Sequence, residues 1–138
     1  MMAGIRGRNT RPEMTLRKAL HRQGFRYRLH KPGLPGKPDL VLAKHRAAIF
    51  VHGCFWHRHE GCHWCSIPKT NVDFWNEKLG SNSQRDQRDI ALLRKSGWRV
   101  AVVWECGLKT RTIDVIEDVS AWLQSDQPYF ETEVVRPK

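Results

Sequence analysis

Residues 38–52 read PDLVLAKHRAAIFVH and contain two apolar runs, residues 40–43 and 47–51, joined by a short polar connection. Apolar runs separated by only a few residues are typical of the two strands of a hairpin. Because both runs are almost wholly apolar, we expect these strands to lie in the centre of a sheet.

On the N-terminal side of the hairpin, the sequence predicts a helix, a strand and a loop. Thr10 and Glu13 have the spacing of a capping box, so a helix is expected from there to about residue 23, where a glycine follows. Residues 25–30 alternate apolar and polar side chains, as a half-buried strand does. Residues 31–38 contain three Pro and two Gly and can only be a loop.

On the C-terminal side, residues 71–79 and 84–95 read as helices, residues 98–104 as an apolar strand, and residues 112–124 as a helix. The last helix is expected to bury one face, formed by Ile113, Ile116, Val119 and Leu123. The tail, about residues 125–138, is expected to be loosely held. The order α-β-β-β-α-α-β-α predicts an α/β fold, a mixed sheet flanked by helices.

The length and hydropathy exclude a membrane span. A chain of 138 residues fits a single domain, residues 1–138. No apolar run approaches the roughly 18 residues that a membrane span needs, and the first residues lack the apolar core of a signal peptide. We therefore expect a cytoplasmic protein with no membrane partner.

The charge points to a polyanionic partner. The 24 Lys and Arg against 14 Asp and Glu give a formal net charge of +10. Residues 1–31 hold nine Lys and Arg and one acid, whereas residues 113–138 hold six acids and two bases. A basic half favours nucleic acid, because each neutralised phosphate releases counterions. The six Trp suit stacking on bases, although core packing is the commoner use of Trp.

A dense group of His and Cys predicts a zinc site. Residues 52–65 hold four of the seven His and three of the four Cys. Three soft ligands lie in one frame, Cys54, His59 and Cys62. A tetrahedral zinc site needs a fourth. Cys65 would complete a CxxC pair with Cys62, whereas Cys106 would tie the loop to the sheet after the last strand, and the spacing leaves both open.

A second metal site is suggested by Asp39 and the end of the following strand. Asp39 precedes the run 40–43, Val51 ends the run 47–51, and His52 follows it. Adjacent strands would bring a carboxylate, a backbone carbonyl and an imidazole together. Oxygen ligands of this kind suit Mg²⁺. A Pro-Asp at a strand start more often serves only the preceding turn, so the pattern alone leaves this site open.

Motifs along the chain resemble the very-short-patch repair (Vsr) endonucleases. They are LPGKPDLV (34–41), FVHGCFWHRH (50–59), FW (74–75), RD (85–86), GWRV (97–100) and WEC (104–106). The resemblance covers about residues 2–109, and its HGCFWHRH block is highly specific. It implies a restriction-endonuclease-like fold with a divergent PD-(D/E)xK arrangement that lacks the usual Lys. Members of this family nick DNA beside the thymine of a T:G mismatch, the product of 5-methylcytosine deamination.

The resemblance also implies a catalytic site. Asp39 matches the family's metal-binding aspartate, and Val51 matches the residue whose backbone carbonyl helps to hold magnesium. Val51 stands where well-known members have Thr, but carbonyl ligation needs no particular side chain. His52 and His57 match the two active-site histidines, and Asp86 matches the acidic partner of the catalytic histidine.

The same resemblance implies a structural zinc and a DNA wedge. The implied zinc ligands are Cys54, His59, Cys62 and Cys106. Cys65 and His63 would then be spectators. Four protein ligands leave no position open for water, which makes the zinc structural. The aromatic residues that would enter the DNA stack are Phe55, Trp56 and Trp75.

Together these matches predict a magnesium-dependent phosphodiester hydrolase that acts on double-stranded DNA in mismatch repair. We expect a monomer, with a MutL-type repair factor as a candidate partner. His57, oriented by Asp86, is the expected general base, because an imidazole titrates near neutral pH. His52 would support the phosphate or a metal-bound water. The chain begins about where the family's first helix does, so most of the basic N-terminal arm is expected to be missing.

Two other functions fit the same sequence. A non-catalytic, zinc-stabilised DNA-binding module would explain the charge, the aromatics and the His/Cys cluster, but it leaves Asp39, His52 and His57 without a role. A restriction-type enzyme on the same fold would cut both strands. A plasmid-nicking assay with and without Mg²⁺ separates the enzyme from the binding module, and comparing nicked with linear product on mismatched and matched duplexes separates the two enzymes.

Overall fold

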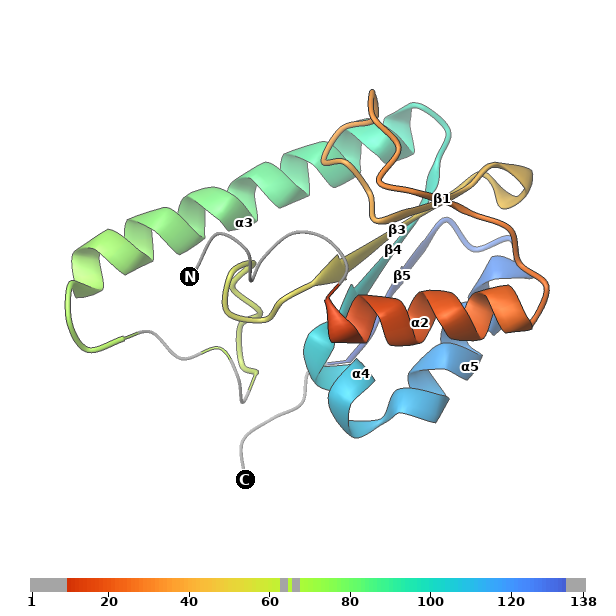
Figure 1. Ribbon diagram of the computed structural model, residues 1–138. Helices are drawn as coiled ribbons and strands as arrows, with labels where there is room; N and C mark the ends of the chain where they lie inside the picture. The colour runs from red at the N-terminus through yellow and green to blue at the C-terminus, as the bar shows by residue number, and fades with distance from the viewer. Residues whose placement is uncertain (1–9, 63–64, 66–67, 134–138) are drawn as a thin grey trace.

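A sheet with the strand order β1-β2-β3-β4-β5 forms the centre of the computed structural model, which describes residues 10–62, 65 and 68–133 (Figure 1). The strands are β1 (Arg28–Leu29), β2 (Leu40–Leu42), β3 (Ala47–His52), β4 (Arg99–Trp104) and β5 (Tyr129–Glu131). Neighbours pair antiparallel from β1 to β3 and parallel from β3 to β5. The sheet is therefore mixed, as the element order predicted.

The predicted central hairpin is confirmed. Leu40 pairs with Ile49 and Leu42 with Ala47, and every residue of β2 is buried. The connection between the two strands is a short 3-10 turn, Ala43–His45, closed by Arg46 in the left-handed region at φ 48°.

Helices cover both faces of the sheet. They are α2 (Arg11–Arg22), α3 (Val72–Lys95), α4 (Glu105–Thr110) and α5 (Thr112–Leu123). Figure 1 shows α2, α4 and α5 on one side of the sheet and α3 on the other. Successive strand side chains point to opposite faces, which gives two cores. Leu42, Ile49 and Val103 pack with α2 and α5 residues, whereas Phe50 and Val102 pack toward Leu93 of α3.

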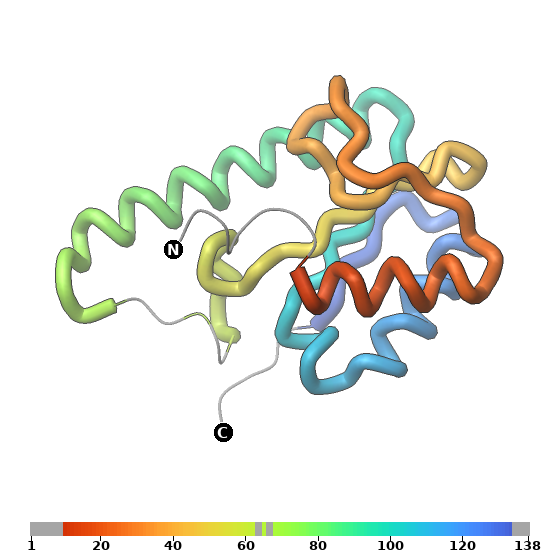
Figure 2. The backbone as a smooth tube through the Cα atoms, in the orientation of Figure 1, coloured from red at the N-terminus to blue at the C-terminus, as the bar shows by residue number. Residues whose placement is uncertain are grey.

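Helix α3 differs from the expectation of two helices. Residues 71–79 and 84–95 were expected to form separate helices, but α3 runs without a break through Gly80 and Ser81. A glycine inside a helix costs only about 1 kcal/mol relative to alanine, which is too little to end a long helix. The N-terminal part of α3 projects past the sheet in the tube view (Figure 2). The buried side chains of the whole helix are Leu79 and Leu93.

Three other expectations need correction. Strand β1 covers only Arg28–Leu29 of the expected residues 25–30. The buried face of α5 is formed by Val115, Val119, Trp122 and Leu123. Ile113 was expected on that face but is 70% exposed. The helix is rotated about its axis relative to the expectation, so that Val115 takes the buried position.

Of the expected loose tail, residues 125–138, the structure describes residues 125–133, which contain a strand, whereas residues 134–138 lie outside the described residues. Residues 129–131 form β5, which pairs in register with β4, and Thr132 donates its backbone N–H to Val102 O at 3.1 Å. Pairing with an inner strand satisfies backbone groups that a loose tail would leave to water. None of the described helices is long and apolar enough to cross a membrane.

Candidate active site

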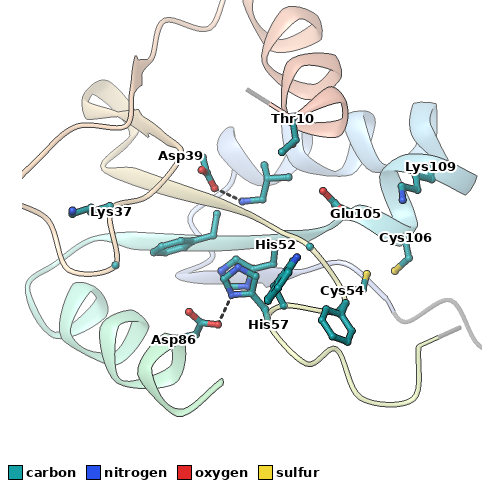
Figure 3. Close-up of a pocket in the computed structure, with 16 residues that line it drawn as sticks. Thr10, Lys37, Asp39, His52, Cys54, His57, Asp86, Glu105, Cys106 and Lys109 are labelled. Atoms are coloured by element: carbon teal, nitrogen blue, oxygen red, sulfur yellow. Dashed lines mark hydrogen bonds and ion pairs between the residues drawn. The ribbon is translucent and has the colours of Figure 1, made fainter. Parts of the chain in front are cut away.

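A pocket of about 350 Å³ opens where β2 begins and β3 ends (Figure 3). Its lining includes Asp39, Val51, His52, His57 and Asp86. These five residues come from the start of β2, the end of β3, the loop that follows and the middle of α3. They are the residues for which the sequence predicted magnesium binding and catalysis, and the fold brings all of them to one cavity.

Asp39 is fixed by the hairpin register. Because Leu40 pairs with Ile49, Asp39 reaches the end of β3, where its Oδ2 accepts the Val51 N–H at 2.7 Å. Burial raises the pKa of Asp39 to about 7, the Val51 N–H lowers it, and the nearby Glu13 carboxylate adds to the rise. The charged form is therefore costly here unless a cation compensates it.

Two residues beside Asp39 were missed by the sequence analysis. Glu13, the first-turn acid of α2, is 1% exposed, and its Oε2 lies 3.0 Å from His30 Nε2. His30 Nδ1 in turn lies 3.7 Å from Asp39 Oδ1. The three side chains are close enough together to hold a metal ion. Glu13 shares the buried stripe of α2 with Leu16 and Leu20, and an acid on an apolar stripe was the signal that could have revealed it.

The two histidines of the pocket are stacked. The rings of His52 and His57 lie 3.8 Å apart, centroid to centroid, at an interplanar angle of 3°. His52 is 4% exposed, and burial, together with His57 and His59, holds its pKa well below the usual range. His52 is therefore neutral at physiological pH.

His57 is oriented by α3. Its Nδ1 lies 2.6 Å from Asp86 Oδ2 (Figure 3). A carboxylate accepts but does not donate, so in the neutral imidazole the proton lies on Nδ1 and the lone pair on Nε2. His57 and Asp86, which the resemblance paired, therefore lie in contact in the pocket.

A buried Cys₃His cluster lies next to the pocket and could hold a zinc ion. Its members are Cys54, His59, Cys62 and Cys106, with all ligand atoms within 4.8 Å of one another. His59 Nδ1 lies 3.6 Å from Cys106 Sγ. A tetrahedral site with Zn–S of about 2.3 Å and Zn–N of about 2.1 Å separates sulfur and nitrogen by about 3.6 Å, so the donors fit this metal.

The structure therefore favours Cys106 over Cys65 as the fourth ligand. Cys65 is half-buried and lies outside the cluster. Burial raises the pKa of its thiol, as it does for Cys54. His63, the other expected spectator, lies outside the described residues.

The three predicted wedge residues form one aromatic group. The ring centroid of Phe55 lies 5.1 Å from that of Trp56 and 5.4 Å from that of Trp75, and both contacts are edge-on. The three are half-buried and belong to neither core. Phe74, 59% exposed, extends the group by contact with Trp75 at 5.1 Å. Asn82 of α3 donates to Trp56 O at 3.1 Å, which braces the loop.

Comparison with solved structures gives the class of fold. The catalytic domain of the homing endonuclease I-Bth0305I superposes with a TM-score of 0.51 at 20% identity, covering 84% of this chain and 97% of that one. The likeness to that domain shows the fold.

Comparison of sequences gives the family. The family model for the DNA mismatch endonuclease Vsr matches residues 1–64. The type II nicking enzyme V.XorIIP of Xanthomonas oryzae is 51% identical over 78% of this chain and 79% of its own length. The DNA mismatch endonuclease Vsr of Escherichia coli is 46% identical over 80% of this chain and 70% of its own. The chain belongs to the Vsr endonuclease family and is an endonuclease that acts on DNA.

Proposed function

We propose that this enzyme nicks one strand of double-stranded DNA beside the thymine of a T:G mismatch left by 5-methylcytosine deamination, and that the cut requires magnesium. The observation that carries the proposal is the single pocket that joins Asp39 to the His57–Asp86 pair. The names of two relatives, a mismatch endonuclease and a nicking enzyme, support the substrate and the single cut.

The metal would be held by the Asp39 carboxylate and the Val51 carbonyl. The raised pKa of Asp39 and its contact with the backbone of Val51 fit a cation site at this position. When bound there, magnesium would supply a Lewis acid that stabilises the charge developing on the phosphate. Glu13 and His30 would add a buried acid and an imidazole beside it.

The protons would be handled by the histidine pair. His57 accepts the proton of the attacking water at Nε2, while Asp86 holds Nδ1–H and stabilises the imidazolium that forms. His52, neutral and stacked on His57, would donate a hydrogen bond to the scissile phosphate. Lys37 and Lys109 line the same pocket on either side of Asp39 and would attract the backbone phosphates (Figure 3).

Zinc in the Cys₃His cluster would be structural. It would fasten the loop after β3 to α4 through Cys106, and so set the position of the aromatic group carried by that loop. The aromatic group would enter the duplex beside the mismatch, where opening the stack costs least. We further propose a monomeric, cytoplasmic enzyme and keep a MutL-type factor as its candidate partner.

A strand-resolved nicking assay tests the proposal. Duplexes with T:G or T:A at one position are labelled separately on each strand and incubated with Mg²⁺ or with EDTA. We expect a single nick beside the thymine of T:G, only with Mg²⁺, and a loss of at least about 10²-fold in rate for Asp39→Asn with DNA binding retained. Cutting of both strands would favour the restriction-type alternative, and binding without any cut would favour the non-catalytic one.

A further inference from the structure

Trp104, the last residue of β4, is held at two points by β5 and the residue after it. Its indole Nε1–H donates to Glu131 Oε2 at 2.8 Å, and its backbone N–H donates to Thr132 Oγ1 at 2.9 Å. Tyr129 donates its hydroxyl to the other oxygen of Glu131, also at 2.8 Å. The position of the indole is thus fixed by residues that carry none of the predicted catalytic or zinc-binding roles.

The same indole touches both functional centres. Its ring is stacked on His59 of the Cys₃His cluster at 3.9 Å and 0°. It meets His52 of the catalytic pocket edge-on at 5.1 Å and 72°. Trp104, Tyr129 and Glu131 also line a second cavity of about 600 Å³ that borders both of these histidines.

His52 depends on such ring contacts for its orientation. Within the part of the chain that the structure describes, its buried Nδ1 has no hydrogen-bond partner. Three rings contact the imidazole: His57 stacks on it at 3.8 Å, Trp104 lies at 5.1 Å and Phe50 at 5.5 Å, centroid to centroid. A displacement of the indole would therefore leave the imidazole less well placed.

We propose that Trp104, held by Glu131, is a positioning residue that couples the Cys₃His cluster to the catalytic histidines. The inference rests on the proposed function, since it assigns His52 to the reaction and His59 to zinc. Glu131 acts at one remove: its carboxylate fixes the indole, and the indole fixes the two imidazoles. The C-terminal strand β5 thereby contributes to catalysis without touching the substrate.

The test compares three variants of the full-length zinc-loaded protein. Glu131→Ala removes the acceptor of the indole N–H, and Glu131→Gln retains an oxygen that can accept it. Glu133→Ala is the matched control, because Glu133 is an acid two residues further along the chain. Its carboxylate forms a salt bridge with Arg111 at 3.6 Å. Each variant is measured for single-turnover nicking rate, DNA affinity, melting temperature and the rate at which a chelator removes zinc.

We expect Glu131→Ala to lower the single-turnover rate about three- to tenfold, the worth of one hydrogen bond, with DNA affinity within about twofold of wild type. Zinc should be released several-fold faster, because His59 loses its fixed neighbour. Glu131→Gln should recover most of both losses, and Glu133→Ala should change neither. The melting temperature of all three should stay within a few degrees of wild type, which separates positioning from global destabilisation.

A double-mutant cycle adds an independent test. Trp104→Phe keeps a ring but removes the N–H, so adding Glu131→Ala to it should cost nothing further. Equal behaviour of Glu131→Ala and Glu133→Ala, or additive losses in the cycle, would overturn the proposal. If wild-type protein cuts neither T:G nor T:A duplexes, the proposed function fails, while the zinc-release comparison still decides whether Glu131 positions the cluster.

Discussion

At the scale of single residues, Asp39 shows how a buried functional group costs stability. Its pKa is about 7 in the folded protein, against an ordinary value of 3.8. Between these values the folded state binds a proton that the unfolded chain has released. The free energy of unfolding of the metal-free protein therefore falls as pH rises from about 4 to about 7, and the penalty is complete above that range.

Asp39→Asn should consequently be more stable than wild type in EDTA at pH 8, by up to about 4 kcal/mol, because the amide carries no charge to bury. Near pH 4 the two proteins should melt at the same temperature. Adding Mg²⁺ at pH 8 should raise the melting temperature of wild type and leave the variant unchanged. Thermal melts at the two pH values decide this, and a variant that melts below wild type at pH 8 would contradict it.

Asp86 should matter through the tautomer of His57. An amide in Asp86→Asn can donate to Nδ1, which would favour the proton on Nε2 and remove the lone pair that accepts the proton of water. We expect a fall of about 10³-fold in single-turnover nicking with little change in DNA affinity. Asp89→Asn, one turn further along α3, serves as the control and should nick normally. A variant of Asp86 with wild-type turnover would remove His57 from the role of base.

Zinc ligation gives a paired prediction for two cysteines. Cys106→Ala opens the Cys₃His cluster and should lose zinc and lower the melting temperature by about 10 °C or more. Cys65→Ala, outside the cluster, should retain one zinc per chain and melt close to wild type. Elemental analysis of both variants is the measurement, and the reverse pattern would show that Cys65 is the fourth ligand.

The site was only partly predictable from single residues. Asp39, Val51 and His52 stand next to strand ends, so strand pairing predicts that they meet. His57 lies in the loop after β3 and was predicted only from the resemblance. Asp86 could be placed by resemblance alone, because an acid in a charged helix is usually a surface residue. Glu13 was missed although its place on the apolar stripe of α2 was a signal, because its approach to Asp39 depends on how α2 packs on the sheet. His30 was missed because the pairing of β1 with β2 brings it to Asp39.

At the scale of elements, the central hairpin and β4 were predictable because each of their strands is an almost wholly apolar run, which is typical of a buried strand. Two helices were expected where α3 runs without a break through Gly80, and a loosely held tail was expected where β5 forms. Three residues of β5 bury little by themselves, and their order comes from pairing with β4. Tertiary pairing of this kind lies outside what local propensity can report.

The aromatic loop is the element with the clearest prediction. Trp56 is half-buried in the aromatic group, apart from both cores, so Trp56→Ala should change the melting temperature little and reduce the preference for T:G over T:A duplexes. Trp122, 5% exposed in the core, is the matched control, and Trp122→Ala should cost about 3–5 kcal/mol without altering mismatch preference in the folded protein. A large stability loss for Trp56→Ala with unaltered preference would place it in the core and exclude the wedge.

At the scale of the whole molecule, charge separation sets how the enzyme meets DNA. The formal charge of +10 is concentrated toward the N-terminal half, whereas residues 113–138 hold six acids against two bases. Lys37, from the loop before β2, and Lys109 of α4 line the same pocket as the catalytic residues (Figure 3). Binding should therefore weaken steeply with salt, through counterion release.

Lys37 provides the test of this arrangement. If it contacts one phosphate, Lys37→Ala should weaken T:G and T:A duplexes by the same factor and reduce the slope of log affinity against log salt by about one. Lys44→Ala is the control, because Lys44 lies in the turn between β2 and β3, outside the pocket lining, and should leave the slope unchanged. Affinities measured over a salt series for both duplexes supply the comparison. A loss confined to T:G would mean that Lys37 reads the mismatch itself, because a contact with phosphate cannot distinguish a guanine partner from an adenine one.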